Sequence, residues 1–149
     1  MAEMYLNLAE ILIELDALEN TTGRLEEAKG LIDKIRVRAG IPTIDEAWKK
    51  ANHPEKANTA EGLREIVRRE RQIEFYLENQ RFWDLRRWKD AGILGEKVWG
   101  MNIEGDTDET FFVPTELQNI RTFKQAQYLM PIPMTETNKV PHIIQNPGY

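Results

Sequence analysis

The chain has 149 residues, a net charge of −5 and a mean hydropathy of −0.57. This acidic balance gives no long-range attraction to phosphate backbones, so we expect no nucleic-acid partner. The sequence contains no cysteine and no serine, which excludes disulfide scaffolds, thiolate metal sites and serine or cysteine nucleophiles.

The first predicted element is a helix over residues 2–18. Apolar residues recur there at helical spacing and leave only a narrow polar strip, formed by Glu3, Asn7, Glu10 and Glu14. A helix this apolar needs cover on more than one side, and no capping residue precedes it. We therefore expect the chain on its own to expose an apolar face and to self-associate through it.

A second helix follows the turn at residues 20–23 and ends at Gly40, with Pro42 beyond, so the first two helices form a hairpin of tetratricopeptide size. Thr43 and Glu46 have capping-box spacing and open a short helix that includes Trp48. A third long helix starts near residue 58 or 59 and runs to 78 or 79, and a fourth covers 81–91.

Helical periodicity fades after Gly92, where glycine and proline punctuate the chain. Short extended segments are predicted at residues 97–103, 110–113 and 127–130, and one helical turn at 115–120. The expected fold is mainly α: a tetratricopeptide-like hairpin, two further helices, and an irregular C-terminal third containing short strands. No linker divides the chain, so we expect a single domain over residues 1–149.

Two carboxylates of the third helix, Glu70 and Glu74, fall in the middle of its apolar face, which is defined by Leu63, Ile66, Val67, Ile73 and Leu77. An unpaired charge buried there would cost several kcal/mol, so each carboxylate needs a cation. Arginine suits this role because its planar fork binds a carboxylate and stays charged. The predicted structural cluster consists of Arg36, Arg38, Glu70, Arg71, Glu74, Arg81 and Asp84.

The same two glutamates have an alternative interpretation as the acid and base of a glycoside hydrolase. A general acid needs a raised pKa, whereas neighbouring arginines favour the charged form. The abundance of arginine around Glu70 and Glu74 therefore favours the structural interpretation.

Other chemical signals are weaker. His53 and His142 have no second ligand at helical spacing, and no phosphate-binding glycine loop occurs, so we expect no metal and no cofactor. Residues 64–89 combine eight bases with five aromatic rings, but the net charge of 61–90 is only +1, which is typical of packing. Trp48 and Trp99 lie in looser segments and are candidate stacking platforms for a sugar ring.

Six stretches, in this order, resemble the C-terminal portion of the SusD/RagB family of outer-membrane nutrient-binding lipoproteins of Bacteroidetes. They are residues 2–10, 35–40, 69–71 with Glu74, 81–88, 128–133 with Glu136, and the terminal 145–149. Two positions depart from the family pattern: Asp33, where the family often has asparagine, and Asn79, where it often has glycine.

The resemblance implies an α-superhelical protein that captures an oligosaccharide or another nutrient without catalysis and delivers it to a SusC-like TonB-dependent transporter. It implies a lipid anchor at the outer-membrane surface of the full-length protein, with the signal peptide, the lipidated cysteine and most ligand-binding aromatics in a part N-terminal to Met1. The matched signature residues are implied to be scaffold. A free-standing tetratricopeptide-like protein-interaction module is the alternative function.

Overall fold

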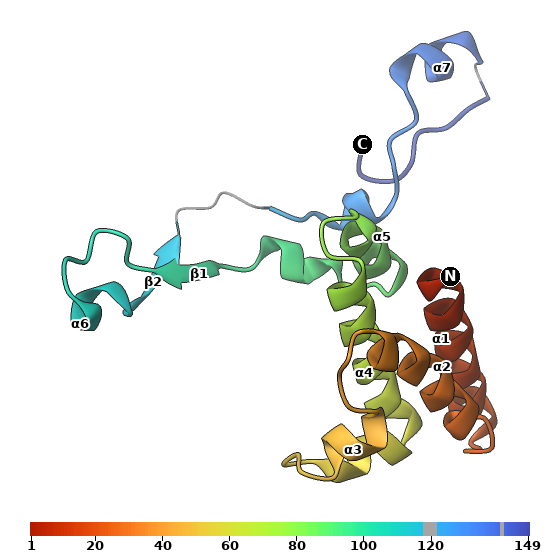
Figure 1. The fold of residues 1–149 in the computed structure, drawn as a ribbon. Coiled ribbons are helices and arrows are strands. Elements are labelled where there is room, and N and C mark those ends of the chain that lie inside the picture. Colours follow the sequence, from red (N-terminus) through yellow and green to blue (C-terminus); the bar gives the residue numbers. More distant parts are fainter. Residues whose placement is uncertain (118–121, 141) are drawn as a thin grey trace. The chain divides into compact units, whose positions relative to one another are not determined.

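The structure is a computed structural model that describes residues 1–117, 122–140 and 142–149 (Figure 1). It divides into two compact units, Met1–Arg81 and Phe82–Tyr149, which are described separately. The expected mainly α fold with short strands in the C-terminal third is confirmed. The single-domain organisation stays a prediction.

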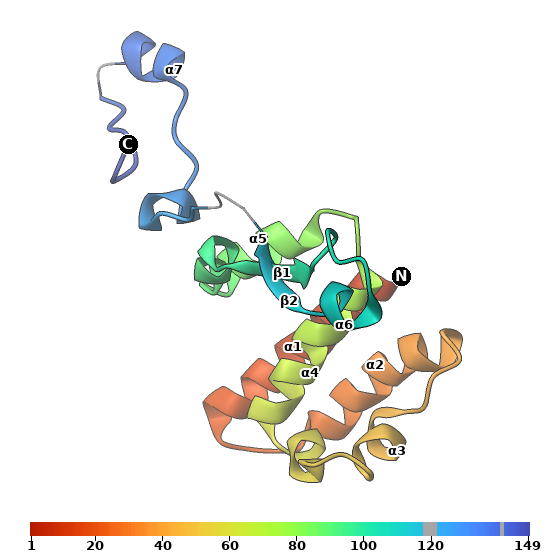
Figure 2. The same cartoon turned by 90° about the vertical axis from the view of Figure 1, so that its left-hand side faces the viewer.

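The first unit is a helical hairpin with a third long helix packed against it (Figure 2). Its elements are α1 (Ala2–Glu19), α2 (Leu25–Arg38), α3 (Ile44–Trp48), the 3-10 helix η1 (Pro54–Asn58) and α4 (Ala60–Glu74). The predicted turn chemistry is present: Gly40 adopts a φ of 74° after α2, and Thr43 and Glu46 form the expected capping box.

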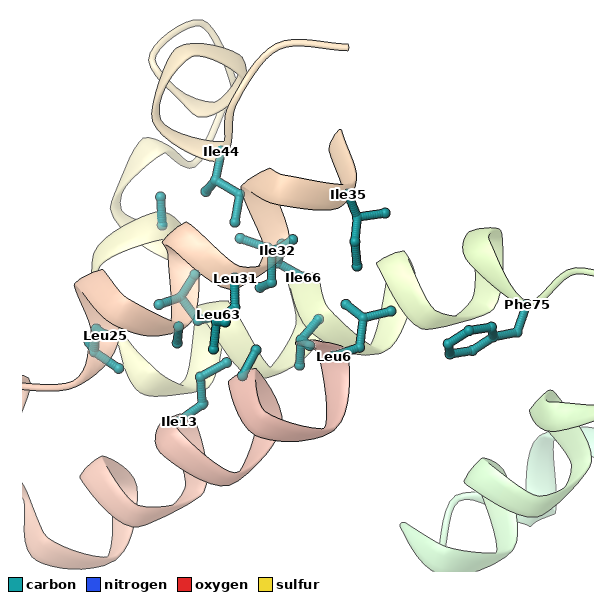
Figure 3. Close-up of a cluster of buried hydrophobic side chains, with 14 residues drawn as sticks. Leu6, Ile13, Leu25, Leu31, Ile32, Ile35, Ile44, Leu63, Ile66 and Phe75 are labelled. Atoms are coloured by element: carbon teal, nitrogen blue, oxygen red, sulfur yellow. The ribbon is translucent and has the colours of Figure 1, made fainter. Parts of the chain in front are cut away.

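The core of this unit lies where α1, α2 and α4 meet (Figure 3). Leu6 and Ile13 of α1, Ile32 of α2 and Leu63 of α4 are fully enclosed, and Ile44 of α3 closes one side. Burying each of these side chains stabilises the fold by roughly 1.5–3 kcal/mol. The hairpin therefore does not stand alone, because α4 supplies its third wall.

Helix α1 exposes an apolar face, as predicted. The predicted polar strip faces α4, and its Glu10 is only 7% exposed. The exposed apolar residues have the spacing of a second helical stripe: Met4, Leu8, Ile11, Leu15 and Leu18. Arginines of α4 bind the strip: Arg71 contacts Glu10 and Arg64 contacts Glu14.

Helix α4 ends at Glu74, about one turn before the predicted end. Leu77 and Asn79 follow with φ values of 67° and 64°, in the left-handed region that ends an α-helix. The predicted core positions Ile73, in the last turn of α4, and Leu77, beyond its end, are 61% and 87% exposed. That part of the predicted apolar face is wrong, while Leu63, Ile66 and Val67 are buried as expected.

The second unit contains most of α5 (Gln80–Arg87) and a series of short elements. These are η2 (Ala91–Gly95), β1 (Val98–Met101), α6 (Asp108–Phe111), β2 (Pro114–Leu117), η3 (Gln125–Tyr128) and α7 (Met134–Lys139). Strands β1 and β2 pair antiparallel, with Val98 opposite Leu117 and Met101 opposite Pro114.

The predictions for this unit are partly wrong. Only the first predicted strand, at 97–103, contains a strand of the structure. Residues 110–113 fall partly in α6, and residues 127–130 overlap η3, because turns with local side-chain hydrogen bonds override β propensity there. Residues 115–117 belong to β2 rather than to a helical turn, and 118–120 lie outside the described residues.

The last residues fold back on the segment at 129–132. The Gln145 amide donates to the Ile132 carbonyl and accepts from the Ile132 N–H, both at 2.8 Å. Asn146 Nδ2 donates to the Met130 carbonyl at 2.6 Å, and Tyr149 Oη donates to the Leu129 carbonyl at 3.1 Å. Two of the stretches singled out in the sequence are thus each other's hydrogen-bond partners.

Candidate functional site

Glu70, the first of the two central glutamates, lies at the interface between α2 and α4. The Arg36 guanidinium donates to the Glu70 carboxylate, and these side chains are only 12% and 10% exposed. Arg36 Nε also donates to the Pro42 carbonyl at 2.7 Å, so one guanidinium joins α4 to the loop that follows α2. A charge-assisted pair that is this enclosed fixes how two helices are aligned.

Glu74 pairs with Arg38, four residues further along α4 and two residues further along α2. Arg38 Nη2 donates to both Glu74 carboxylate oxygens, at 2.5 and 2.7 Å. The Arg38 side chain is 61% exposed, so water screens this pair more than the Arg36 pair. The two pairs advance together along α2 and α4, which shows that these helices run parallel.

Arg71 points to the other neighbour of α4, helix α1. Its side chain is 4% exposed, its Nη1 donates to Asn7 Oδ1 at 2.6 Å, and its Nε lies 4.0 Å from Glu10 Oε2. Arg64 continues this contact by binding Glu14 through two nitrogens, at 2.6 and 2.8 Å. The sequence did not single out the Arg64–Glu14 pair.

Arg81 ends the first unit and Asp84 belongs to the second, so each is described within its own unit, and their place in the predicted cluster stays a prediction. Asp84 is buried in α5 and accepts a hydrogen bond from Arg87 Nη2 at 3.0 Å, three residues along the same helix. Arg81 is half-buried, and no ion pair of Arg81 is seen in the described part of the chain. The structure therefore brings together Arg36 with Glu70 and Arg38 with Glu74, and it places Arg71 against α1.

This arrangement bears on the choice between catalysis and scaffold. Each of the two glutamates accepts a charge-assisted hydrogen bond from an arginine of α2. A glycoside hydrolase needs one carboxyl group held protonated, with both groups flanking a substrate-sized gap. Glu70 instead lies at a packed helix interface, where a sugar has no room.

The two candidate tryptophans differ in their surroundings. Trp48, at the end of α3, is half-buried, packs on the core of the first unit, and lines a pocket together with Lys29 and Asn58. Trp99 lies on β1 of the second unit, opposite Glu116, and is 60% exposed. Each is available for stacking in a different unit.

Two buried charged side chains, Asp16 and Lys29, were not predicted from the sequence. Asp16 is fully enclosed at the end of α1, where it accepts hydrogen bonds from the Thr21 hydroxyl and from the backbone N–H and guanidinium of Arg24. Lys29 of α2 is 4% exposed and pairs with Glu26 and Asp45. A signal for Asp16 was present, because it stands three residues after the core residue Ile13.

No group of three or more metal-ligating side chains occurs in the described ranges. Among the helices of the described residues, none combines the length and the apolar character needed to cross a bilayer.

Comparison with known proteins places these contacts in context. The sequence matches the SusD family model over residues 1–149. The chain belongs to the SusD family. Among solved structures, this SusD-family chain is similar to a SusD-like protein (BF3747) from Bacteroides fragilis NCTC 9343, with 36% identity and a TM-score of 0.72 over 99% of this chain and 25% of that one.

Two structures of the protein BT4246 are also similar to this SusD-family chain. Their identities are 32% and 34% and their TM-scores 0.78 and 0.76, over 99% of this chain and 24% and 23% of theirs. The chain thus spans about a quarter of the length of these structures. No match was found among curated proteins.

Proposed function

We propose that this chain is part of a cell-surface nutrient-binding protein whose ligand is an oligosaccharide and which acts without catalysis. The observation that carries the proposal is membership of the SusD family over the whole chain. The ion pairs agree with it, because Glu70 and Glu74 are engaged by arginines between packed helices. Members of this family are outer-membrane-associated surface lipoproteins, and we assign the same location to the full-length protein.

We further propose that the protein delivers its ligand to a SusC-like TonB-dependent transporter. Family membership supports this partnership. A free-standing tetratricopeptide-like interaction module would instead bind another protein and no glycan. The two functions therefore differ in an observable way.

The test uses the full-length product of the gene that encodes this chain. It is screened against a panel of oligosaccharides by calorimetry and is affinity-purified from outer membranes under mild detergent. We expect binding of at least one glycan and recovery of a TonB-dependent transporter in near-stoichiometric amount. Absence of glycan binding together with recovery of an unrelated soluble partner would favour the interaction module.

A further inference from the structure

The first unit carries a pocket of about 340 Å³ at the meeting point of α2, α3 and η1. This volume is at the lower end of the range for small-molecule sites, roughly 300–1,000 Å³. Its apolar wall is made by the Trp48 indole, the Pro54 ring and Ala57. Trp48 contacts the core with part of its surface, so the indole is held in place while another part lines the pocket.

The polar side of the pocket is organised by one buried ammonium group. Lys29 Nζ lies 3.1 Å from Asp45 Oδ1 and 3.5 Å from Asn58 Oδ1, and it forms an ion pair with Glu26. Burial lowers the pKa of Lys29, but the hydrogen bonds from Lys29 to Glu26 and Asp45 outweigh burial and leave that pKa raised. Lys29 thus stays charged and orients acceptor groups that come from three different elements.

The two short elements that wall the pocket are held in position by contacts outside it. The Thr43–Glu46 capping box and a 2.8 Å hydrogen bond from the Ile44 N–H to Asp33 fix the start of α3. Gly62 of α4 approaches η1 so closely that a Cβ there would lie 2.2 Å from the Lys56 carbonyl oxygen. A site that is pre-formed in this way loses little entropy on binding.

The charges around the pocket indicate what kind of ligand it would take. Glu26 and Asp45 are balanced by Lys29 and Lys49, so the lining has no net charge and does not favour an ionic ligand. Carboxylates, an amide and ammonium groups beside an indole suit a molecule with many hydroxyl groups and one apolar face. A neutral pyranose ring has this chemistry.

We propose that this pocket binds a single neutral monosaccharide unit, with the ring stacked on Trp48 and its hydroxyls bonded to Asp45 and Asn58. The proposal rests on the proposed glycan-binding function and names a subsite for it. Three methyl glycopyranosides serve as probes, those of glucose, galactose and mannose. Each is added to the full-length protein and followed by saturation-transfer difference NMR, with titration to obtain Kd.

Two variants test the pocket and one serves as the matched control. Trp48→Leu keeps an apolar side chain against the core but removes the ring, and Asn58→Ala trims an exposed side chain. Tyr76→Leu removes an aromatic ring that is 74% exposed and outside the pocket. Melting curves establish that all three variants are folded.

We expect millimolar binding of at least one glycoside, an affinity reduced about tenfold or more in Trp48→Leu and Asn58→Ala, and no change in Tyr76→Leu. The proposal is overturned if none of the three glycosides binds, or if both pocket variants bind as well as the parent. Oligosaccharide binding measured on the same samples separates the two ideas. If the protein binds an oligosaccharide but none of the three glycosides, the proposed subsite is wrong and the proposed function stands.

Discussion

At the scale of single residues, the exposure of an ion pair decides how much it contributes to stability. The pairs Arg36–Glu70 and Arg38–Glu74 join the same two helices, but the first is enclosed and the second is open to water on the arginine side. Removing one partner of an enclosed pair leaves a desolvated charge, whereas an exposed pair is replaced by water at little cost.

We therefore predict that Arg36→Met lowers the free energy of unfolding by about 3 kcal/mol, because Glu70 remains buried without its cation. The control Arg38→Met should cost less than about 1 kcal/mol. The double variant Arg36→Met/Glu70→Met should be more stable than Arg36→Met alone. Urea unfolding of the four proteins measures these differences, and equal losses at Arg36 and Arg38 would contradict the structural role of the enclosed pair.

Asp16 gives a prediction about pH. Burial raises its pKa, but hydrogen bonds from Thr21 and Arg24 outweigh burial and lower the pKa of Asp16 below the ordinary value of 3.8. A carboxyl group with a lowered folded pKa stabilises the protein above its unfolded pKa, and this contribution is lost as the pH falls through the folded value. Asp16→Asn should therefore be less stable than the parent near neutral pH, and the gap should narrow in acid.

Thermal unfolding of the parent and of Asp16→Asn, followed from neutral pH down through 3.8, checks this expectation. Thr22→Ala in the same turn serves as a control, because Thr22 forms no side-chain hydrogen bond with Asp16. A stability difference that stays constant over the whole pH range would show that the Asp16 carboxylate is not the group responsible.

At the scale of elements, backbone proximity decides which glycines can be replaced. Gly62 lies at the start of α4, where an added Cβ would overlap the backbone of η1, whereas Gly30 lies in α2 with open space around it. We predict that Gly62→Ala displaces η1 and destabilises the first unit. Gly30→Ala should stabilise it by about 0.5–1 kcal/mol through helix propensity. Paired unfolding curves measure both effects, and a neutral Gly62→Ala would mean that η1 moves freely.

Helix α1 presents a second apolar stripe, and this stripe predicts association. Leu8 and Ile11 are 41% and 55% exposed, in line with Met4, Leu15 and Leu18. We predict that the 149-residue chain sediments as a concentration-dependent oligomer, and that Leu8→Gln/Ile11→Gln makes it monomeric without loss of folding. A parent chain that sediments as a monomer at every concentration, with no binding of hydrophobic dye, would refute this.

Much of the element pattern could be read from the sequence, and the failures have physical reasons. The end of α2 and the start of α3 could be predicted because Gly40, Thr43 and Glu46 act only on the backbone next to them. The partner of Glu10 could not be predicted, since its contact with Arg71 depends on how α4 packs on α1. The predicted end of α4 was too late because Leu77 and Asn79 adopt left-handed backbone conformations. A leucine rarely adopts this conformation, so its presence in the sequence does not indicate a helix end.

At the scale of the whole molecule, the candidate site was predictable in part. Carboxylates on an apolar helix face require cations, and this argument led to Arg36 and Arg38, which the structure places beside Glu70 and Glu74. The same argument could not locate Arg81 or the pocket at Trp48, because these depend on how loops and short helices meet. The resemblance to the SusD family depends on the order of several short motifs along the chain, and the family model matches the whole chain. No single contact in the structure identifies the family.

The central proposal is that the arginine–glutamate pairs hold helices together in a protein that, as we propose, binds a glycan and does not cleave it. The most direct measurement incubates the full-length protein and its Glu70→Gln/Glu74→Gln variant with the oligosaccharide that binds best and follows the release of reducing ends. We predict no release by either protein, together with a lower melting temperature for the variant. Release of reducing ends by the parent that disappears in an equally stable variant would contradict the account.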